Sequence, residues 1–375
     1  MIPFNKPYLT GKELTYIGDA VTKGKISGNG YYTNLCHRFF ETKYGIHKCL
    51  LTTSCTDALE MAAILINIQE GDEVIMPSYT FVSTANAFVL RGAKIIFVDS
   101  RTDHPGLDEN KIEALITPKT KAIVPVHYAG VACDMDKIME LAHQYNLFVI
   151  EDAAQAIASF YTGKDGVQRP LGSIGHLAAF SFHETKNIIS GEGGMLAIND
   201  SQFAERAEII WEKGTNRSAF FRGEVDKYGW VDVGSSFLPS EIIAAFLWAQ
   251  LENLDDIQQV RKSHWEKYYR ELHEWAAENE IQLPVMPTFA TNNGHMFYLV
   301  CKTLAQRTAI IQKLKSKDIL SVFHYISLHS SPFYSEIHKD NPLPQSDRYS
   351  DCLLRLPMYY ELDVMNVVNN LIHEY

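Results

Sequence analysis

The sequence predicts an α/β protein with a large, mostly parallel sheet covered by helices on both faces, and a smaller α/β domain at its C-terminal end. Between residues 48 and 200, short apolar segments alternate with amphipathic segments of helical length, which is typical of β-α-β units. Residues 240–279 are helical in character and contain no proline, and the remainder mixes short strands and helices. A chain of 375 residues is also too long for one small core. We therefore expect a large domain over residues 1–250 and a small one over 251–375.

The predicted elements of the large domain follow one another in a regular order. Strands are expected near residues 50–52, 73–76, 94–98, 122–126, 147–150, 177–182 and 195–198, and helices near 57–68, 83–90 and 135–143. The strands are continuous apolar runs, which indicates a sheet that is buried on both faces. The segment 122–126 is included despite Pro125. Residues 240–279 are expected to form one or two helices that leave the large domain.

Composition excludes several classes of partner. The chain carries 34 basic and 45 acidic side chains, a net charge of −11, which gives no broad attraction for nucleic acid or anionic lipid. No signal peptide precedes the first predicted element, and no uncharged apolar run is long enough to span a bilayer. The six cysteines include no C-x-x-C pair. We expect a cytoplasmic protein with reduced thiols, no nucleic-acid partner and no membrane partner.

Polar or aromatic residues follow several of the predicted strands. Because ligands of parallel α/β sheets bind at the carboxyl ends of the strands, these residues are the candidates for a functional site. In chain order they are Ser54, Cys55, Thr56, Phe81, Asp152, Gln155 and Lys186.

This ordered set matches what pyridoxal 5'-phosphate (PLP) requires of a protein. Lys186 would form an imine and move protons, and Asp152 would keep the pyridine nitrogen protonated. The turn 54–56 would present helix N–H groups to the phosphate. Phe81 would cover the ring, and Gln155 would approach the ring oxygen. Each residue alone also fits a plainer role, such as a helix cap, a core aromatic, a local turn or a surface lysine, so the prediction depends on the order of the set.

The same residues lie in segments that resemble a known family. The segments are TSCTDAL (53–59), EDAAQ (151–155), FSFHETK (180–186) with GEGG (191–194), and GSSF (234–237). They are similar to the DegT/DnrJ/StrS family of sugar aminotransferases, and the resemblance extends over essentially the whole chain. It implies the PLP-dependent transferase fold of type I, like that of aspartate aminotransferase.

The resemblance also implies a role for each residue. Lys186 would be the Schiff-base lysine, Asp152 would pair with the pyridine nitrogen, and Gln155 would approach the ring oxygen. Phe81 would stack on the ring. The phosphate would be held by Ser54, the Cys55 backbone, Thr56 and Ser181. Such enzymes are homodimers with shared active sites, and here Ser236 occupies the position from which the partner's loop often contributes an asparagine. Two departures from the usual family pattern are Cys55, in place of a glycine, and Ser236.

Other segments resemble one branch of the family, the dTDP-4-amino-4,6-dideoxygalactose transaminases of the WecE/RffA type. They are residues 77–87, 124–133, 212–218 and 323–325. This implies that L-glutamate donates an amino group to the nucleotide-linked keto-sugar dTDP-4-dehydro-6-deoxy-D-glucose, with pyridoxamine 5'-phosphate (PMP) as intermediate. The products would be dTDP-4-amino-4,6-dideoxy-D-galactose, which supplies O-antigen, lipopolysaccharide or enterobacterial common antigen synthesis, and 2-oxoglutarate. The expected substrate-binding residues are His183, Lys213, Arg217 and Tyr325, although residues 213–217 also fit a solvated loop.

Four alternatives remain at this point. A 3-aminotransferase acting on dTDP-3-dehydro-6-deoxyhexose would use the same residues. A PLP-dependent 3-dehydratase carries histidine at the position of Lys186. A non-catalytic PLP-fold sensor or regulator would need a DNA-binding module, for which the chain has no spare length. A metal site could draw on His127, His183, His324 and His329, but their spacing is not that of metal ligands, so no metal is expected.

Overall fold

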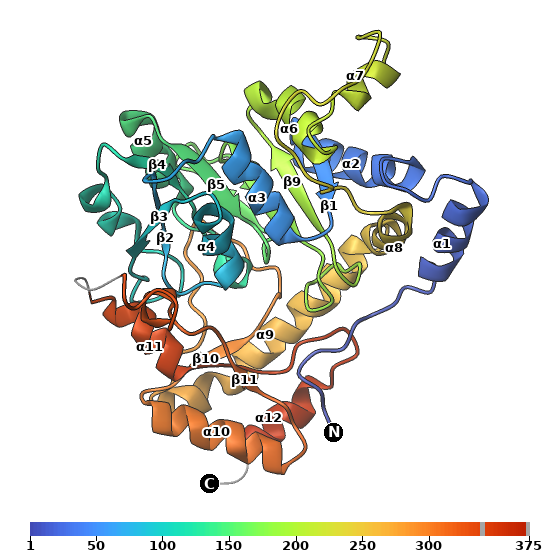
Figure 1. Ribbon diagram of the computed structural model, residues 1–375. Coiled ribbons are helices and arrows are strands. Elements are labelled where there is room, and N and C mark those ends of the chain that lie inside the picture. The colour runs from blue at the N-terminus through green and yellow to red at the C-terminus, as the bar shows by residue number, and fades with distance from the viewer. Residues whose placement is uncertain (338–341, 373–375) are drawn as a thin grey trace.

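The computed structural model describes residues 1–337 and 342–372, and its largest unit is a seven-stranded sheet of order β1-β9-β8-β5-β4-β2-β3 (Figure 1). The strands are β1 (Lys48–Thr52), β2 (Glu73–Pro77), β3 (Lys94–Val98), β4 (Thr120–Ile123), β5 (Phe148–Asp152), β8 (Leu177–Ser181) and β9 (Gly194–Ile198). Only β9 runs antiparallel to its neighbours β1 and β8. The predicted mostly parallel α/β sheet is therefore confirmed.

Helices cover both faces of this sheet. One face packs against α3 (Cys55–Leu65), α4 (Val82–Val89) and α6 (Ala204–Trp211), and the other against α2 (Tyr31–Tyr44), α5 (Met135–Tyr145) and α8 (Glu241–Leu251). The strand side chains alternate between the two cores: Leu177 and Ala179 belong to the first, and Ala178 to the second. This two-sided burial is why the strands read as continuous apolar runs.

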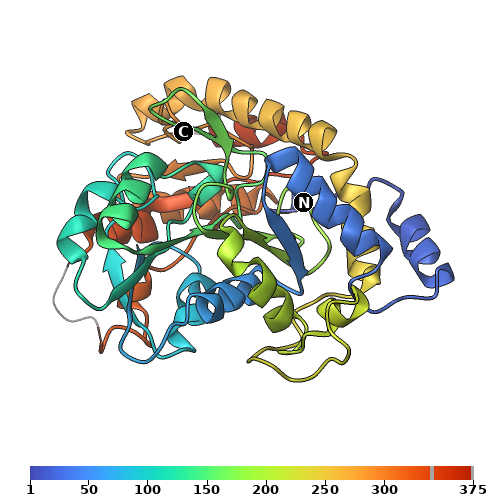
Figure 2. The same ribbon diagram turned by 90° about the horizontal axis from the view of Figure 1, so that it is seen from above.

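A second, smaller sheet lies at the other end of the molecule. It has the order β10-β12-β11 and consists of β10 (Tyr298–Val300), β12 (Leu353–Arg355) and β11 (Val322–Phe323), all antiparallel. The long helix α9 (Leu254–Glu278) runs from the large sheet to the small one in Figure 1, and it lies along one edge of the molecule in the view of Figure 2. Ile2 forms an isolated parallel bridge with Ile319, which places the N-terminal segment beside the chain that leads into β11. The division at residue 250 stays a prediction.

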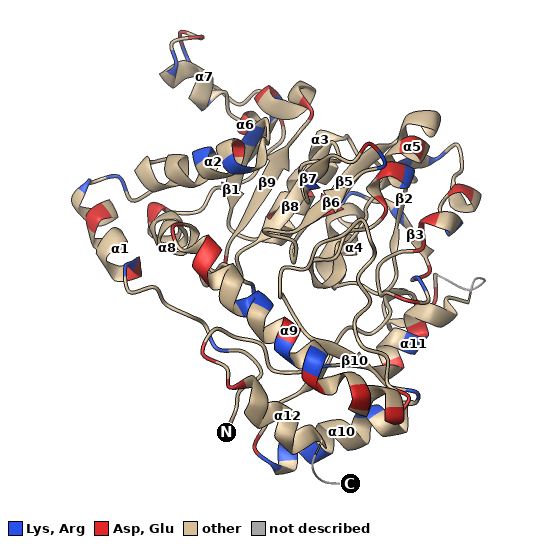
Figure 3. Cartoon of the chain, turned by 180° about the vertical axis from the view of Figure 1, so that it is seen from behind, with Lys and Arg blue, Asp and Glu red and all other residues tan. Residues whose placement is uncertain are grey.

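The remaining elements are short or peripheral. They are α1 (Glu13–Thr22), α7 (Arg217–Phe221), α10 (Leu304–Ser316), α11 (Pro344–Cys352), α12 (Val364–Ile372) and the hairpin of β6 (Phe160–Thr162) and β7 (Gln168–Pro170). Both signs of charge alternate along α9, as Figure 3 shows, which is typical of a solvated helix face. In the part of the chain that the structure describes, we find no helix with the length and apolarity needed to cross a bilayer.

Two predicted boundaries differ from the structure for physical reasons. The strand expected at 122–126 is β4, Thr120–Ile123, and it ends early because Pro125 has no N–H to donate to the ladder. The helix expected from residue 57 begins at Cys55, because the Ser54 side chain accepts the backbone N–H of Asp57 and caps it. Residues 240–279 form two helices, α8 and α9.

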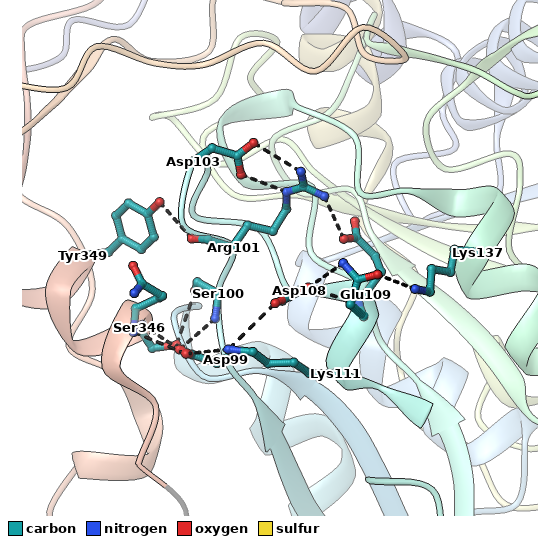
Figure 4. Close-up of polar contacts among 12 residues, drawn as sticks. Asp99, Ser100, Arg101, Asp103, Asp108, Glu109, Lys111, Lys137, Ser346 and Tyr349 are labelled. Atoms are coloured by element: carbon teal, nitrogen blue, oxygen red, sulfur yellow. Dashed lines mark hydrogen bonds and ion pairs between the residues drawn. The ribbon is translucent and has the colours of Figure 1, made fainter. Parts of the chain in front are cut away.

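A cluster of polar contacts joins α11 to the end of β3 (Figure 4). The Asp99 carboxylate accepts the Ser346 backbone N–H at 2.9 Å and its hydroxyl at 3.0 Å, and it pairs with Lys111 at 3.1 Å. Arg101 pairs with Asp103 at 3.0 Å and with Glu109 at 3.1 Å. We call these five charged residues and Ser346 the Asp99 cluster. Its contacts fix the small-sheet end of the chain against the large sheet.

Candidate active site

A cavity of about 1000 Å³ opens beside the carboxyl ends of β5 and β8, between the two sheets. Ten of the thirteen residues predicted for the site line it. They are Ser54, Cys55, Thr56, Phe81, Asp152, Gln155, Ser181, His183, Lys186 and Tyr325. Residues as far apart in the sequence as Ser54 and Tyr325 are therefore brought together at the edge of the sheet where ligands of parallel α/β sheets bind.

The N-terminus of α3 forms one wall of the cavity. The first N–H groups of any helix lack partners inside the helix, so those of Cys55 and Thr56 are free to face an anion. The Thr56 hydroxyl donates to the Ser83 hydroxyl at 2.8 Å. A Cβ on Gly194 would lie 2.3 Å from the Ser54 carbonyl carbon, so glycine is required for β9 to approach this turn. The wall suits a phosphate group.

Asp152 ends β5 and is only 6% exposed. Its carboxylate accepts the Thr84 hydroxyl at 2.7 Å and the Ala154 N–H at 3.2 Å. Burial raises the pKa of this carboxyl, although both hydrogen bonds and the nearby Lys186 oppose the effect. A cation bound in the cavity would relieve the cost of the buried negative charge.

Lys186 lies in the loop after β8, and its side chain faces the cavity. Burial lowers the pKa of its amine, and the positive charge of Arg355 adds to this effect. The neighbouring Asn187 fixes the loop: its amide donates to Gln258 at 2.8 Å and its oxygen meets the His295 ring at 2.8 Å. Lys186 is thus a positioned amine with an increased neutral, nucleophilic fraction.

Gln155, Tyr325 and Phe81 form a second wall. The Gln155 oxygen accepts the Ala129 N–H at 2.6 Å, and its amide donates to the Tyr325 hydroxyl at 3.0 Å. Phe81 is 54% exposed, and its ring centre lies 6.0 Å from that of Tyr325. An aromatic ring this exposed is not a core residue, and it is available to cover a planar ligand.

The comparisons with known proteins agree with this geometry. The model of the DegT/DnrJ/EryC1/StrS aminotransferase family matches residues 7–372. The chain belongs to this family. GDP-perosamine synthase of Escherichia coli O157:H7 is 33% identical over 348 residues, which cover 92% of this chain and 90% of that protein. SpsC of Bacillus subtilis, a spore coat polysaccharide biosynthesis protein, is 31% identical over 389 residues, which cover 99% and 97%.

Solved structures extend the likeness to three dimensions. A Streptococcus pneumoniae protein described as a sugar aminotransferase has been solved with PLP and with PMP, and it is 25% identical to this chain. Its PMP form has a TM-score of 0.90 and covers 100% of this chain and 98% of that chain. The chain is therefore a PLP-dependent sugar aminotransferase of the predicted fold, which aminates a nucleotide-linked keto-sugar and uses PLP and PMP as the two forms of its cofactor.

The lining of the cavity fits PLP. The buried Asp152 has no cationic hydrogen-bond partner in the described chain, as expected where a protonated pyridine would pair with it. The α3 N-terminus provides N–H groups at one wall, and Lys186 faces the same space. These features suit the three chemically distinct parts of the cofactor, namely the ring nitrogen, the phosphate and the aldehyde carbon.

Three predicted residues lie outside the cavity. Lys213, Arg217 and Ser236 are exposed in the segment that contains α7, which projects from the rest of the molecule in Figure 1. Ser236 pairs with Glu212 in an isolated antiparallel bridge. Their expected roles in binding substrate or the partner's phosphate stay predictions.

The histidines considered for a metal site have other partners. His127 bonds to Glu151 at 2.9 Å, His324 to the Tyr128 hydroxyl at 2.7 Å, and His329 to the Ser78 hydroxyl at 2.7 Å. Within residues 1–337 and 342–372, no three side chains of the metal-binding types converge. His183 lines the cavity with Lys186, as His324 also does, and its ring nitrogen lies 2.8 Å from the Thr185 hydroxyl.

Sequence reasoning missed part of the lining. Phe4, Asn5, His295 and Arg355 also line the cavity. The Asn5 amide donates to the Glu184 carbonyl at 3.1 Å, and the Arg355 guanidinium lies 4.6 Å from the centre of the Phe4 ring. None of these four residues follows a strand of the large sheet. The rule that ligands bind at the carboxyl ends of parallel strands therefore does not predict them.

Proposed function

We propose that this enzyme transfers the amino group of L-glutamate to C4 of dTDP-4-dehydro-6-deoxy-D-glucose, giving dTDP-4-amino-4,6-dideoxy-D-galactose and 2-oxoglutarate. The observation that carries the amination chemistry is that Lys186, Asp152 and the N-terminus of α3 meet at one cavity. The choice of sugar is supported by the resemblance of residues 77–87 and 323–325 to the WecE/RffA branch. Residues 80–83 and 323–325 belong to the lining of that cavity.

The cavity residues would divide the work of holding the cofactor. Asp152 would hold the proton of the pyridine nitrogen, and Phe81 would cover the ring face. Gln155 would approach the ring oxygen. The phosphate would be held by Ser54, the Cys55 backbone, Thr56 and Ser181. When bound, PLP withdraws electrons from the carbon that carries the amino group, which makes its proton removable.

Lys186 acts twice in this proposal. Its free amine would accept the proton of the donor's α-carbon, because burial lowers the pKa of the amine. In the second half of the reaction it delivers a proton to the sugar carbon. The face from which Lys186 delivers that proton decides between an axial and an equatorial amine.

A GDP-linked sugar is the second candidate substrate. Two relatives carry the name GDP-perosamine synthase, at 33% and 34% identity over 92% and 89% of this chain. The chemistry at Lys186 would be the same, and the difference would lie in the nucleotide and in the configuration of the sugar at C2, because perosamine is a 4-amino-4,6-dideoxymannose. The 3-amination of dTDP-3-dehydro-6-deoxyhexose also requires only another position of the sugar in the same cavity.

We also propose that the active unit is a homodimer. The segment around α7 exposes large apolar side chains, among them Trp230 at 84% and Phe221 at 69%. Such a patch is typical of a surface that another chain covers. Ser236 would then reach the partner's phosphate site, and Lys213, Arg217, His183 and Tyr325 would contact the nucleotide-linked sugar.

Product analysis tests the proposed substrate. The purified enzyme is incubated with PLP, L-glutamate and either dTDP-4-dehydro-6-deoxy-D-glucose or GDP-4-dehydro-6-deoxy-D-mannose, and the product is characterised by NMR. We expect an axial amine at C4 of the dTDP-linked sugar. Amination of the GDP-linked sugar alone, or at C3, would replace the proposal by the corresponding alternative.

A further inference from the structure

His295 lines the cavity together with Lys186, and the chain around it is fixed by buried contacts. Its backbone N–H donates to the Asn293 side-chain oxygen at 2.9 Å, and its carbonyl accepts the Arg261 guanidinium at 2.7 Å. Gly294 makes the preceding turn with φ +61°, and a Cβ there would lie 2.6 Å from the Arg261 carbonyl carbon. The imidazole is therefore held at a defined place in the cavity wall.

Asn187, the residue after Lys186, determines which nitrogen of the His295 ring carries the proton. Its amide nitrogen donates to the Asn293 carbonyl at 2.9 Å and to the Gln258 side-chain oxygen at 2.8 Å. Because a backbone carbonyl can only accept, the amide NH₂ group must lie on that side. The Asn187 oxygen therefore faces the His295 Nδ1 atom, at 2.8 Å. It follows that Nδ1 is the protonated nitrogen and donates this hydrogen bond.

The other ring nitrogen, Nε2, directs a lone pair into the cavity. Burial lowers the pKa of His295 well below its ordinary value, and the positive charges of Lys186 and Arg261 add to this effect. The ring is therefore neutral, and with its proton on Nδ1 the Nε2 atom can only accept. Among the residues that the structure describes, no donor reaches Nε2. The nitrogens of buried side chains are normally bonded, so this atom is left for a donor inside the cavity.

The amine of Lys186 is the donor that fits this position. Its charge influences the His295 ring, so the two groups lie near each other. Within residues 1–337 and 342–372, we find no hydrogen-bond acceptor for the amine, and Asp152 acts on it through charge alone. A lysine amine at the end of a flexible four-carbon stem adopts many conformations. An acceptor in the wall selects the conformations in which the amine faces the reacting carbon.

We propose that His295 is a positioning residue for Lys186: its Nε2 atom accepts a hydrogen bond from the free amine and aims that amine at the carbon whose proton it takes. This inference rests on the proposed function, in which Lys186 moves the proton. The carbon–hydrogen bond of the donor breaks and a nitrogen–hydrogen bond forms at Lys186. The resulting ammonium group donates to Nε2 but keeps its proton, so His295 stays neutral among the positive charges that surround it.

Two substitutions separate the roles of the two ring nitrogens. Asparagine places a polar atom near the position of Nδ1 and can keep the contact with Asn187, whereas glutamine places one near Nε2 and can keep the acceptor. Single-turnover absorbance follows the conversion of the PLP form to the PMP form by L-glutamate. His295→Asn should lower the limiting rate by about tenfold to a hundredfold, with an unchanged apparent affinity for glutamate. His295→Gln should lie closer to the wild-type rate.

Stability should follow the opposite order. His295→Gln leaves the Asn187 oxygen without its donor and should unfold at a lower temperature than His295→Asn. His104→Asn is a matched control, because its ring is 1% exposed, its Nδ1 atom accepts the Gly106 N–H at 2.8 Å, and it lies away from the cavity. This control should leave the limiting rate unchanged. Limiting rates that follow stability, with His295→Asn like the wild type, would show a purely structural ring and overturn the proposal.

Nitrogen NMR of the apoprotein tests the tautomer without cofactor or turnover. In protein carrying isotope-labelled histidine, the signal that is lost in His295→Asn should report a neutral ring protonated at Nδ1. Protonation at Nε2 would overturn the proposal, and so would a loss in His295→Asn that is confined to glutamate affinity. The glutamate half-reaction uses no sugar. A wild-type enzyme that completes it but aminates neither sugar would reject the proposed substrate and leave the proposal for His295 standing.

Discussion

Two arginines of this protein lie in contrasting surroundings. Arg101, in the Asp99 cluster, pairs with both Asp103 and Glu109 (Figure 4). Arg355, at the cavity, faces tyrosine hydroxyls and Phe4 and has no carboxylate partner in the described chain. Both side chains are partly buried, yet only the first is neutralised by the protein itself.

The difference extends to the other charges of the two regions. Asp99 is satisfied by Ser346 and Lys111. By contrast, the buried Asp152 has two neutral donors, and the Lys186 amine forms no ion pair with any residue that the structure describes. Charges that hold the fold are compensated within the chain. Charges at the cavity are left for a cofactor and a substrate to compensate, at a cost to the stability of the ligand-free protein.

The largest expected effect follows from removing the cavity amine. Lys186→Ala should lower amination by about ten-thousandfold or more, because no other group at the cavity can both bond to PLP and move the proton. The rate of 2-oxoglutarate release from L-glutamate measures this. Lys164→Ala, which changes an exposed lysine in the β6–β7 turn, should leave the rate unchanged. Normal turnover by Lys186→Ala would show that the amine has no catalytic role.

Asp152→Asn should have the next largest effect. Turnover should fall by about a hundredfold to a thousandfold, as for loss of a main electrostatic contact to the reacting group. The apoprotein should become more stable by about 1 kcal/mol at neutral pH. Burial raises the pKa of Asp152, so its contribution to stability is present in acid and is lost as the pH rises through that pKa. Urea unfolding of the two apoproteins at neutral pH measures the difference, and a less stable variant would contradict it.

Replacing Arg101, whose charge is compensated by carboxylates, should destabilise the protein, in contrast to replacing Asp152. Arg101→Gln leaves Glu109, whose side chain is 2% exposed, without its cationic partner. We expect a loss of about 2 kcal/mol in the free energy of unfolding. Arg355→Gln should not destabilise the ligand-free protein. Equal destabilisation by the two variants would remove the contrast between the regions.

The smallest effect concerns the acid stability of the Asp99 cluster. Burial opposes ionisation of Asp99, but the hydrogen bonds from Ser346, Lys111 and Gln345 outweigh it and lower the pKa. The stabilisation is therefore present above the ordinary aspartate value of about 4 and is lost as the pH falls below it. Asp99→Asn should weaken this dependence by about 1 kcal/mol. Denaturant unfolding between pH 7 and pH 3 would measure it, and identical pH profiles would contradict the assignment.

The contrast also explains what could be predicted from the sequence. Lys186 and Asp152 follow strands of a parallel sheet, and a local rule places such residues at one edge. Arg355 belongs to a strand of the small sheet, and its approach to Lys186 depends on how α9 and the N-terminal segment bring the two sheets together. No local pattern encodes that packing. Phe4 and Asn5 were missed for the same reason.

Some local predictions failed where one residue overrides a pattern. Pro125 shortens β4 although its neighbours are apolar, and Ser54 starts α3 two residues before the expected helix. The second shift matters for function, since it places the N–H groups of Cys55 and Thr56 at the cavity. Lys213, Arg217 and Ser236 lie outside the cavity of the single chain, and their roles stay predictions.

Covalent mapping of the cofactor tests the central claim most directly. The PLP-loaded enzyme is reduced with borohydride, which makes the carbon–nitrogen bond between lysine and cofactor permanent, and its peptides are then analysed by mass spectrometry. We expect the added mass on Lys186 alone. In Asp152→Asn, Lys186 should carry the same added mass wherever cofactor is still bound. A cofactor attached to any other lysine, with Lys186 unmodified, would contradict it.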